Sequence, residues 1–95
     1  MPAYIIAMVN VTDPARYPEY AKGAGPANAK YGGKFLVRGG AKTALEGDIP
    51  FTRIVIQEFA DAATAKKFYN SPEYQAARKH RLGAAEFNMV IVEGA

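Results

Sequence analysis

The chain has 95 residues, a formal net charge of +3 and a hydrophobic content of 49%, which together indicate a single globular domain with only a weak preference for anionic partners. It contains no cysteine and one histidine, so disulfides, thiolate metal sites and a cysteine nucleophile are excluded and no metal site is expected. The apolar residues 4–9 are too short to span a bilayer and lack the features of a signal peptide. We expect no membrane partner and a protein of the cytoplasm, a reducing compartment that the lack of cysteine suits.

The first half of the chain predicts a strand, a helix and a second strand. Residues 3–11 are rich in tyrosine, isoleucine and valine, and a helix-start signal follows at Thr12-Asp13-Pro14. We expect this helix to be interrupted at residues 23–26, which contain two glycines and a proline, and to stop at Gly32-Gly33. Residues 34–38 form the second predicted strand.

The second half predicts a strand, a helix and a last strand. Residues 53–59 form the third strand, and Asp61 is the N-cap of the helix that follows. Ser71-Pro72 restarts or kinks that helix, since serine is a good N-cap and proline a good first helical residue. Residues 87–93 form the last strand. The β-α-β-β-α-β order predicts a ferredoxin-like α+β fold over residues 1–95, with a four-stranded antiparallel sheet and two helices on one face.

Both faces of the first and last predicted strands are apolar. In the first strand, Tyr4, Ile6 and Met8 alternate with equally apolar neighbours. A sheet that is apolar on both faces must be covered on both, and two helices cover only one. We therefore expect a homodimer in which the uncovered sheet faces of two chains pack together.

Several short motifs are distributed over the whole chain. They are Asp13-Pro14 with Tyr17 and Tyr20, YGGKFLVRGG at 31–40, Glu46-Gly47, Glu58-Phe59, SPEYQ at 71–75, Arg78 with Arg81, and Val92-Glu93-Gly94. In this combination the chain resembles the domain of unknown function 1330 family, which belongs to the dimeric α/β-barrel superfamily. The resemblance implies two ferredoxin-like chains packed sheet against sheet, with a pocket between sheet and helices in each. Superfamily relatives include cofactor-free monooxygenases of small aromatic compounds, muconolactone isomerases and haem-binding or haem-degrading proteins, so the resemblance implies no particular reaction.

Arg38 and Glu58 are the candidate catalytic residues. They lie equally far in sequence from Asp48, so a simple hairpin places them directly opposite each other, whereas a glycine bulge at Gly39-Gly40 puts them on opposite faces. In the functional interpretation, Arg38 holds the negative end of a ligand or an oxyanion, and Glu58 orients it or acts as a base. The alternative is a cross-strand ion pair. The two glycines also allow a ligand to approach the backbone closely.

Four tyrosines and an arginine are the further candidates for ligand binding. The residues Tyr17, Tyr20, Tyr69 and Tyr74 either line a pocket for a small aromatic or carboxylated ligand or pack in the core with satisfied hydroxyl groups. Arg78 shares a helical face with Tyr74 and Arg81.

Two roles are open for Arg78 and Arg81. They either reach a substrate carboxylate or form salt bridges to Glu73 and Glu86, and the second is the more common role of exposed arginines. His80 is interpreted as a surface residue, because it lies between Lys79 and Arg81.

The sequence lacks a phosphate loop and a dinucleotide fingerprint. The third predicted strand lacks the basic-aromatic octapeptide of RNA-recognition domains, so no nucleic acid partner is expected. We expect no cofactor, with haem held by His80 as an alternative. The expected function is binding of a small organic anion or aromatic compound, with or without cofactor-independent monooxygenase- or isomerase-like chemistry. The alternative is a non-catalytic dimeric protein for binding, interaction or stress response.

Overall fold

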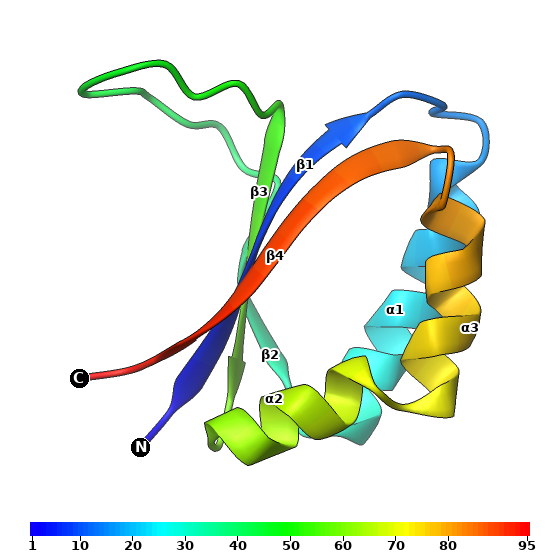
Figure 1. Ribbon diagram of the computed structural model, residues 1–95, viewed down its shortest axis with the longest axis vertical. Helices are drawn as coiled ribbons and strands as arrows, with labels where there is room; N and C mark the ends of the chain where they lie inside the picture. The colour runs from blue at the N-terminus through cyan, green and yellow to red at the C-terminus, as the bar shows by residue number, and fades with distance from the viewer.

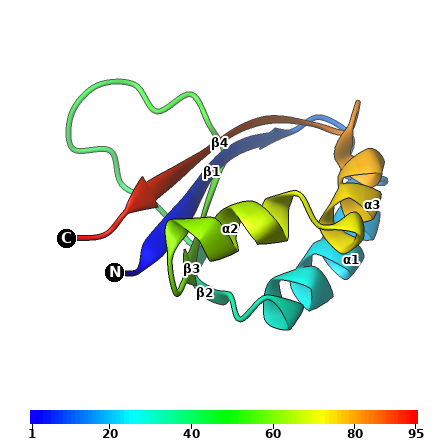
Figure 2. The same cartoon turned by 60° about the horizontal axis from the view of Figure 1, so that its bottom comes forward.

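The computed structural model describes residues 1–95 and shows a four-stranded antiparallel sheet with three helices on one face (Figure 1, Figure 2). Neighbouring strands are all antiparallel, in the order β2-β3-β1-β4. The ferredoxin-like fold is therefore confirmed. The elements in chain order are β1 (Ala3–Val11), α1 (Tyr17–Lys30), β2 (Lys34–Arg38), β3 (Arg53–Phe59), α2 (Ala62–Tyr69), α3 (Pro72–Arg81) and β4 (Ala85–Glu93).

Two side-chain caps divide the second predicted helix into α2 and α3. The Asp61 carboxylate accepts a hydrogen bond from the backbone N–H of Thr64 at 2.7 Å, which begins α2. The Ser71 hydroxyl accepts one from the backbone N–H of Tyr74 at 3.1 Å, and Pro72 follows as the first residue of α3. The chain therefore turns between the two helices, and α3 lies beside α1 while α2 lies near the other end of the sheet (Figure 1).

The predicted interruption of the first helix is wrong. Helix α1 begins at Tyr17, later than the Pro14 signal suggested, and continues through Pro26 without a break. Gly23 lies where α1 meets α3, since a Cβ atom at this position would be only 2.7 Å from the Cβ of Ala77. The packing of the two helices thus keeps a segment of low helix propensity helical. None of the three helices is long and apolar enough to cross a membrane.

The two faces of the sheet differ in what covers them. Side chains that face the helices are buried, as in β1, where Ile5, Ala7 and Val9 are at most 3% exposed. The opposite face has no helix over it, and its apolar side chains remain partly exposed, with Val90 and Val92 at 46% and 44%. We call this surface the open face. From the strand register it includes Tyr4, Ile6, Met8, Lys34, Val37, Ile54, Ile56, Glu58, Asn88, Val90 and Val92.

Candidate functional site

The predicted opposition of Arg38 and Glu58 in a simple hairpin is wrong. Lys34 lies opposite Glu58 in the β2–β3 ladder, whereas Arg38 lies opposite Val55. The register shifts between Phe35 and Val37, and such a bulge changes the face to which the following residues point. The alternative expectation, a bulge at Gly39-Gly40, also separates Arg38 from Glu58. The observed bulge has this effect but lies earlier in the chain, between Phe35 and Val37.

The bulge places the two charged side chains on opposite faces of the sheet. Glu58 lies on the open face, because its neighbour Gln57 is buried beneath the helices. Arg38 faces the helices, and its guanidinium carbon lies 4.2 Å from the centre of the Phe35 ring. A carboxylate on the far face of the sheet does not orient this arginine.

Two cavities lie on the helix-covered side of the sheet. The smaller, of about 70 Å³, lies between α1 and strands β2 and β3, and we call it the α1 cavity. Tyr17, Tyr20 and Arg38 line it, as do Phe87 and Met89. The α1 cavity therefore brings together three of the residues selected from the sequence.

Tyr74 lies in the core and lines neither cavity. Its side chain is 1% exposed, and its hydroxyl oxygen is 3.0 Å from the hydroxyl of Tyr20. The Tyr74 hydroxyl also donates to the sulfur of Met89 at 3.5 Å. Burial, followed by the neighbouring Tyr74, raises the pKa of Tyr20 far above its usual range. Tyr20 therefore stays neutral, and its contact with Tyr74 joins α1 to α3.

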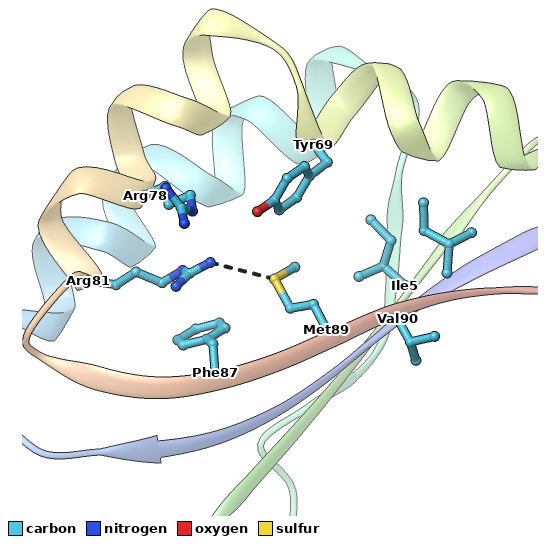
Figure 3. A pocket seen from close by; sticks show the side chains of 8 residues that line it. Ile5, Tyr69, Arg78, Arg81, Phe87, Met89 and Val90 are labelled. Atoms are coloured by element: carbon cyan, nitrogen blue, oxygen red, sulfur yellow. Dashed lines mark hydrogen bonds between the residues drawn. The ribbon is translucent and has the colours of Figure 1, made fainter.

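The larger cavity, of about 530 Å³, lies between α3 and strand β4, next to the end of α2 (Figure 3). We call it the α3 cavity, and its volume is in the range of small-molecule sites. The polar ends of Tyr69, Arg78 and Arg81 point into the same space above β4 (Figure 3). The residues that line it are Ile5, Tyr69, Arg78, Arg81, Phe87, Met89, Val90 and Ile91. The side chain of Val90 points to the other side of β4, onto the open face (Figure 3).

Arg81 is a buried cation without an acidic partner. Only 6% of the residue is exposed, and its guanidinium carbon lies 4.0 Å from the centre of the Phe87 ring. One terminal nitrogen donates to the sulfur of Met89 at 3.7 Å, and the buried Nε atom has no hydrogen-bond partner. A buried charge is costly unless it is paired. An anionic ligand beside Arg81 would offset this cost.

Arg78, a half-buried residue, also has no acidic partner. The predicted salt bridges of the two arginines to Glu73 and Glu86 are therefore wrong. The Nε atom of Arg78 is also buried without a partner. Glu73 instead forms an ion pair with Lys30 and accepts a hydrogen bond from the Tyr31 hydroxyl at 3.2 Å. The hydrogen bond from Lys30 lowers the pKa of Glu73. The only other ion pair of the molecule joins Lys22 and Glu19, so neither arginine of the α3 cavity has a counterion.

Arg53 is a residue that the sequence reasoning did not select. It lines the α1 cavity with Arg38, and its Nε atom is buried without a partner. A signal was available, because residues 53, 55 and 57 share one face of a strand. Of the two candidate glycines, Gly39 adjoins this arginine while Gly40 has nothing near it. His80 is exposed on α3 and lines neither cavity.

Solved structures with this architecture come from several organisms. A protein of unknown function from Rhodopseudomonas palustris is 22% identical, with a TM-score of 0.76 over 99% of this chain and 82% of that chain. A dimeric ferredoxin-like protein of unknown function from Jannaschia sp. CCS1 is 16% identical, with a TM-score of 0.74 over 99% of this chain and 100% of that chain. SnoaB, a cofactor-independent oxygenase from Streptomyces nogalater, is 8% identical, with a TM-score of 0.63 over 99% of this chain and 93% of that chain.

These likenesses show the fold, since the identities are low. No curated protein matches the chain in sequence. The family model described as "Domain of unknown function (DUF1330)" matches residues 2–95. Because this match spans nearly the whole chain, the protein belongs to the domain of unknown function 1330 family.

Proposed function

We propose that this protein binds a small organic anion with an aromatic or otherwise apolar body in the α3 cavity. The observation that carries the proposal is Arg81, which is 6% exposed, faces the cavity and has no carboxylate partner. A guanidinium remains charged and presents a fixed fork of donors that matches a carboxylate. With Arg78 beside it, the cavity offers two cations for the anionic end of one ligand.

The remaining wall suits an apolar ligand body. Six of the eight lining residues are hydrophobic, a composition typical of small-molecule sites with a few polar groups. Phe87 and Tyr69 provide aromatic surfaces on either side of the cavity (Figure 3), and offset stacking on such rings favours an aromatic ligand. Aromatic carboxylates and phenolates are therefore the ligand classes that fit best.

Any reaction in the cavity would require a ligand that is already deprotonated when it binds. The lining residues include no histidine and no carboxylate to serve as a general base. The two guanidinium groups would instead stabilise negative charge on an enolate or phenolate of the bound ligand. The fold likeness to the cofactor-independent oxygenase SnoaB supports this route. Binding without catalysis is the alternative, and the absence of a general base from the lining favours it.

A homodimer through the open face is the second part of the proposal. The open face exposes apolar side chains from all four strands, and a second copy would bury them. Solved structures with this fold from Jannaschia sp. CCS1 and Bacteroides fragilis are described as dimeric. The ligand site lies on the helix-covered side, so dimer formation leaves it accessible.

Arg78→Gln is expected to weaken benzoate binding by at least about tenfold, the effect of losing one charge-assisted hydrogen bond. Isothermal titration calorimetry with benzoate measures the change in the dissociation constant. Benzamide, the neutral isostere of benzoate, should bind the wild type more weakly than benzoate does, by a similar factor. Lys79→Gln is the matched control, because it removes the same charge from the adjacent, exposed position of α3. Equal affinities in Arg78→Gln and Lys79→Gln would contradict an arginine site in this cavity.

A further inference from the structure

The guanidinium group of Arg53 occupies the space beside Gly39 in which the side chain of any other residue would lie. The position of Arg53 at the start of β3 is opposite Val9, whose side chain is buried on the helix-covered face. A Cβ atom on Gly39 would lie 2.2 Å from a terminal nitrogen of Arg53, and Gly39 has a φ of +72°. Residue 39 is thus a glycine for two reasons, the left-handed backbone and the space that the arginine occupies.

Arg38 reaches the same cavity from the neighbouring strand. One terminal nitrogen lies 3.6 Å from where a Cβ atom on Gly25 would be, so the side chain extends from β2 to α1. Two guanidinium groups therefore converge on the α1 cavity from β2 and β3. None of the twelve residues that line this cavity is acidic, and neither arginine takes part in an ion pair.

Tyr17, which also lines the α1 cavity, is a neutral hydrogen-bond donor. Burial raises the pKa of Tyr17, while the charge of Arg53 acts in the opposite direction. The Tyr17 hydroxyl therefore remains protonated at neutral pH and is able to donate a hydrogen bond to an anion. Gln57 also lines the cavity, but its amide nitrogen already donates to Asn28 at 2.9 Å.

We infer that the α1 cavity is a second anion site, specific for a small carboxylate such as formate or acetate. Its volume of about 70 Å³ is far below the roughly 300–1,000 Å³ of sites for drug-sized ligands, which favours a ligand of only a few non-hydrogen atoms. The donor fork of Arg53 matches the two oxygens of a carboxylate and also those of a phosphate, so the test compares acetate with inorganic phosphate. The α3 cavity shares Phe87 and Met89 as a wall, but the second site does not depend on the function proposed for it.

The test is an acetate titration of ¹⁵N-labelled protein at constant ionic strength, with chloride as the balancing anion. The side-chain Nε–H signals of the arginines and the backbone amide of Gly39 are followed by NMR. We expect saturable shifts at Arg53 and Gly39 with a common dissociation constant, whether or not Arg78 and Arg81 also respond to acetate. An unsaturated drift shared by all arginines, or shifts confined to Arg78 and Arg81, would overturn the assignment. Saturation at Arg53 by inorganic phosphate but not by acetate would overturn the carboxylate specificity.

Arg53→Gln and Arg78→Gln form the matched pair of variants. Arg53→Gln should weaken acetate binding, read at the Gly25 amide, by at least about tenfold. Arg78→Gln should change it less than twofold, because Arg78 lines only the α3 cavity. An unchanged acetate affinity in Arg53→Gln would refute the site, and if that variant does not fold, the wild-type titration decides alone. The outcome of benzoate titrations does not affect how the acetate affinities of these two variants are interpreted.

Discussion

Arg81→Met is expected to abolish benzoate binding without a large loss of stability of the folded protein. The buried Nε atom has no partner, and an unsatisfied buried donor costs about 1–3 kcal/mol. Methionine removes this cost and still fills the space against Phe87 and Met89. It also removes the contact with the Phe87 ring, which contributes about 0.5–2 kcal/mol. The two effects oppose each other, so the free energy of unfolding should lie between about 1 kcal/mol below and about 2.5 kcal/mol above that of the wild type.

Urea unfolding at one fixed protein concentration measures the stability, because an assembly makes stability concentration-dependent. Lys79→Met is the matched control, with the same substitution at the exposed neighbouring position of α3. It should retain benzoate binding. A loss of more than about 2 kcal/mol in Arg81→Met, the size of a broken buried network, would show instead that Arg81 holds the fold together.

Ile6→Lys is expected to convert the proposed homodimer into a monomer. Ile6 lies in the middle of β1 on the open face, opposite Ile56 on β3 and Val90 on β4. In a monomer a lysine at this position is solvated. In a dimer packed through the open face it would be buried next to its symmetry mate, and removing each charge from water costs several kcal/mol.

Sedimentation equilibrium at micromolar concentration compares the masses. The wild type should have the mass of two chains and Ile6→Lys the mass of one. Leu82→Lys is the control, because Leu82 is an apolar residue, 46% exposed, that lies at the end of α3, away from the open face. A wild type with the mass of one chain, or dissociation of both variants, would refute an interface on the open face.

Local signals in the sequence were sufficient for the order of the elements. The tyrosine, isoleucine and valine content of β1 and the caps at Asp61 and Ser71 depend on residues near one another in the chain, so they could be recognised without a structure. The continuity of α1 could not, because the helix is maintained by contact with Ala77, far away in sequence. Propensity alone predicted a break where tertiary packing preserves the helix.

The candidate sites depended on information that the sequence did not contain. The bulge between Phe35 and Val37 involves no glycine or proline, so nothing marked the residue at which the faces exchange. Helical spacing correctly placed Arg78 and Arg81 on one face, since both line the α3 cavity. That Glu73 would pair with Lys30 instead depends on how α1 and α3 meet. The lack of a counterion at Arg81 is therefore a property of the fold and not of the local sequence.

The most direct test of the anion site in the α3 cavity is a benzoate titration of wild-type protein, observed through the arginine Nε–H signals. Arg81 and Arg78 have buried Nε atoms without partners and line this cavity, so an anion bound there must change their environment. We predict saturable shifts at both arginines with one common dissociation constant, and no shift at Arg53. Saturable binding that leaves Arg78 and Arg81 unchanged would contradict the account, as would the absence of any saturable change.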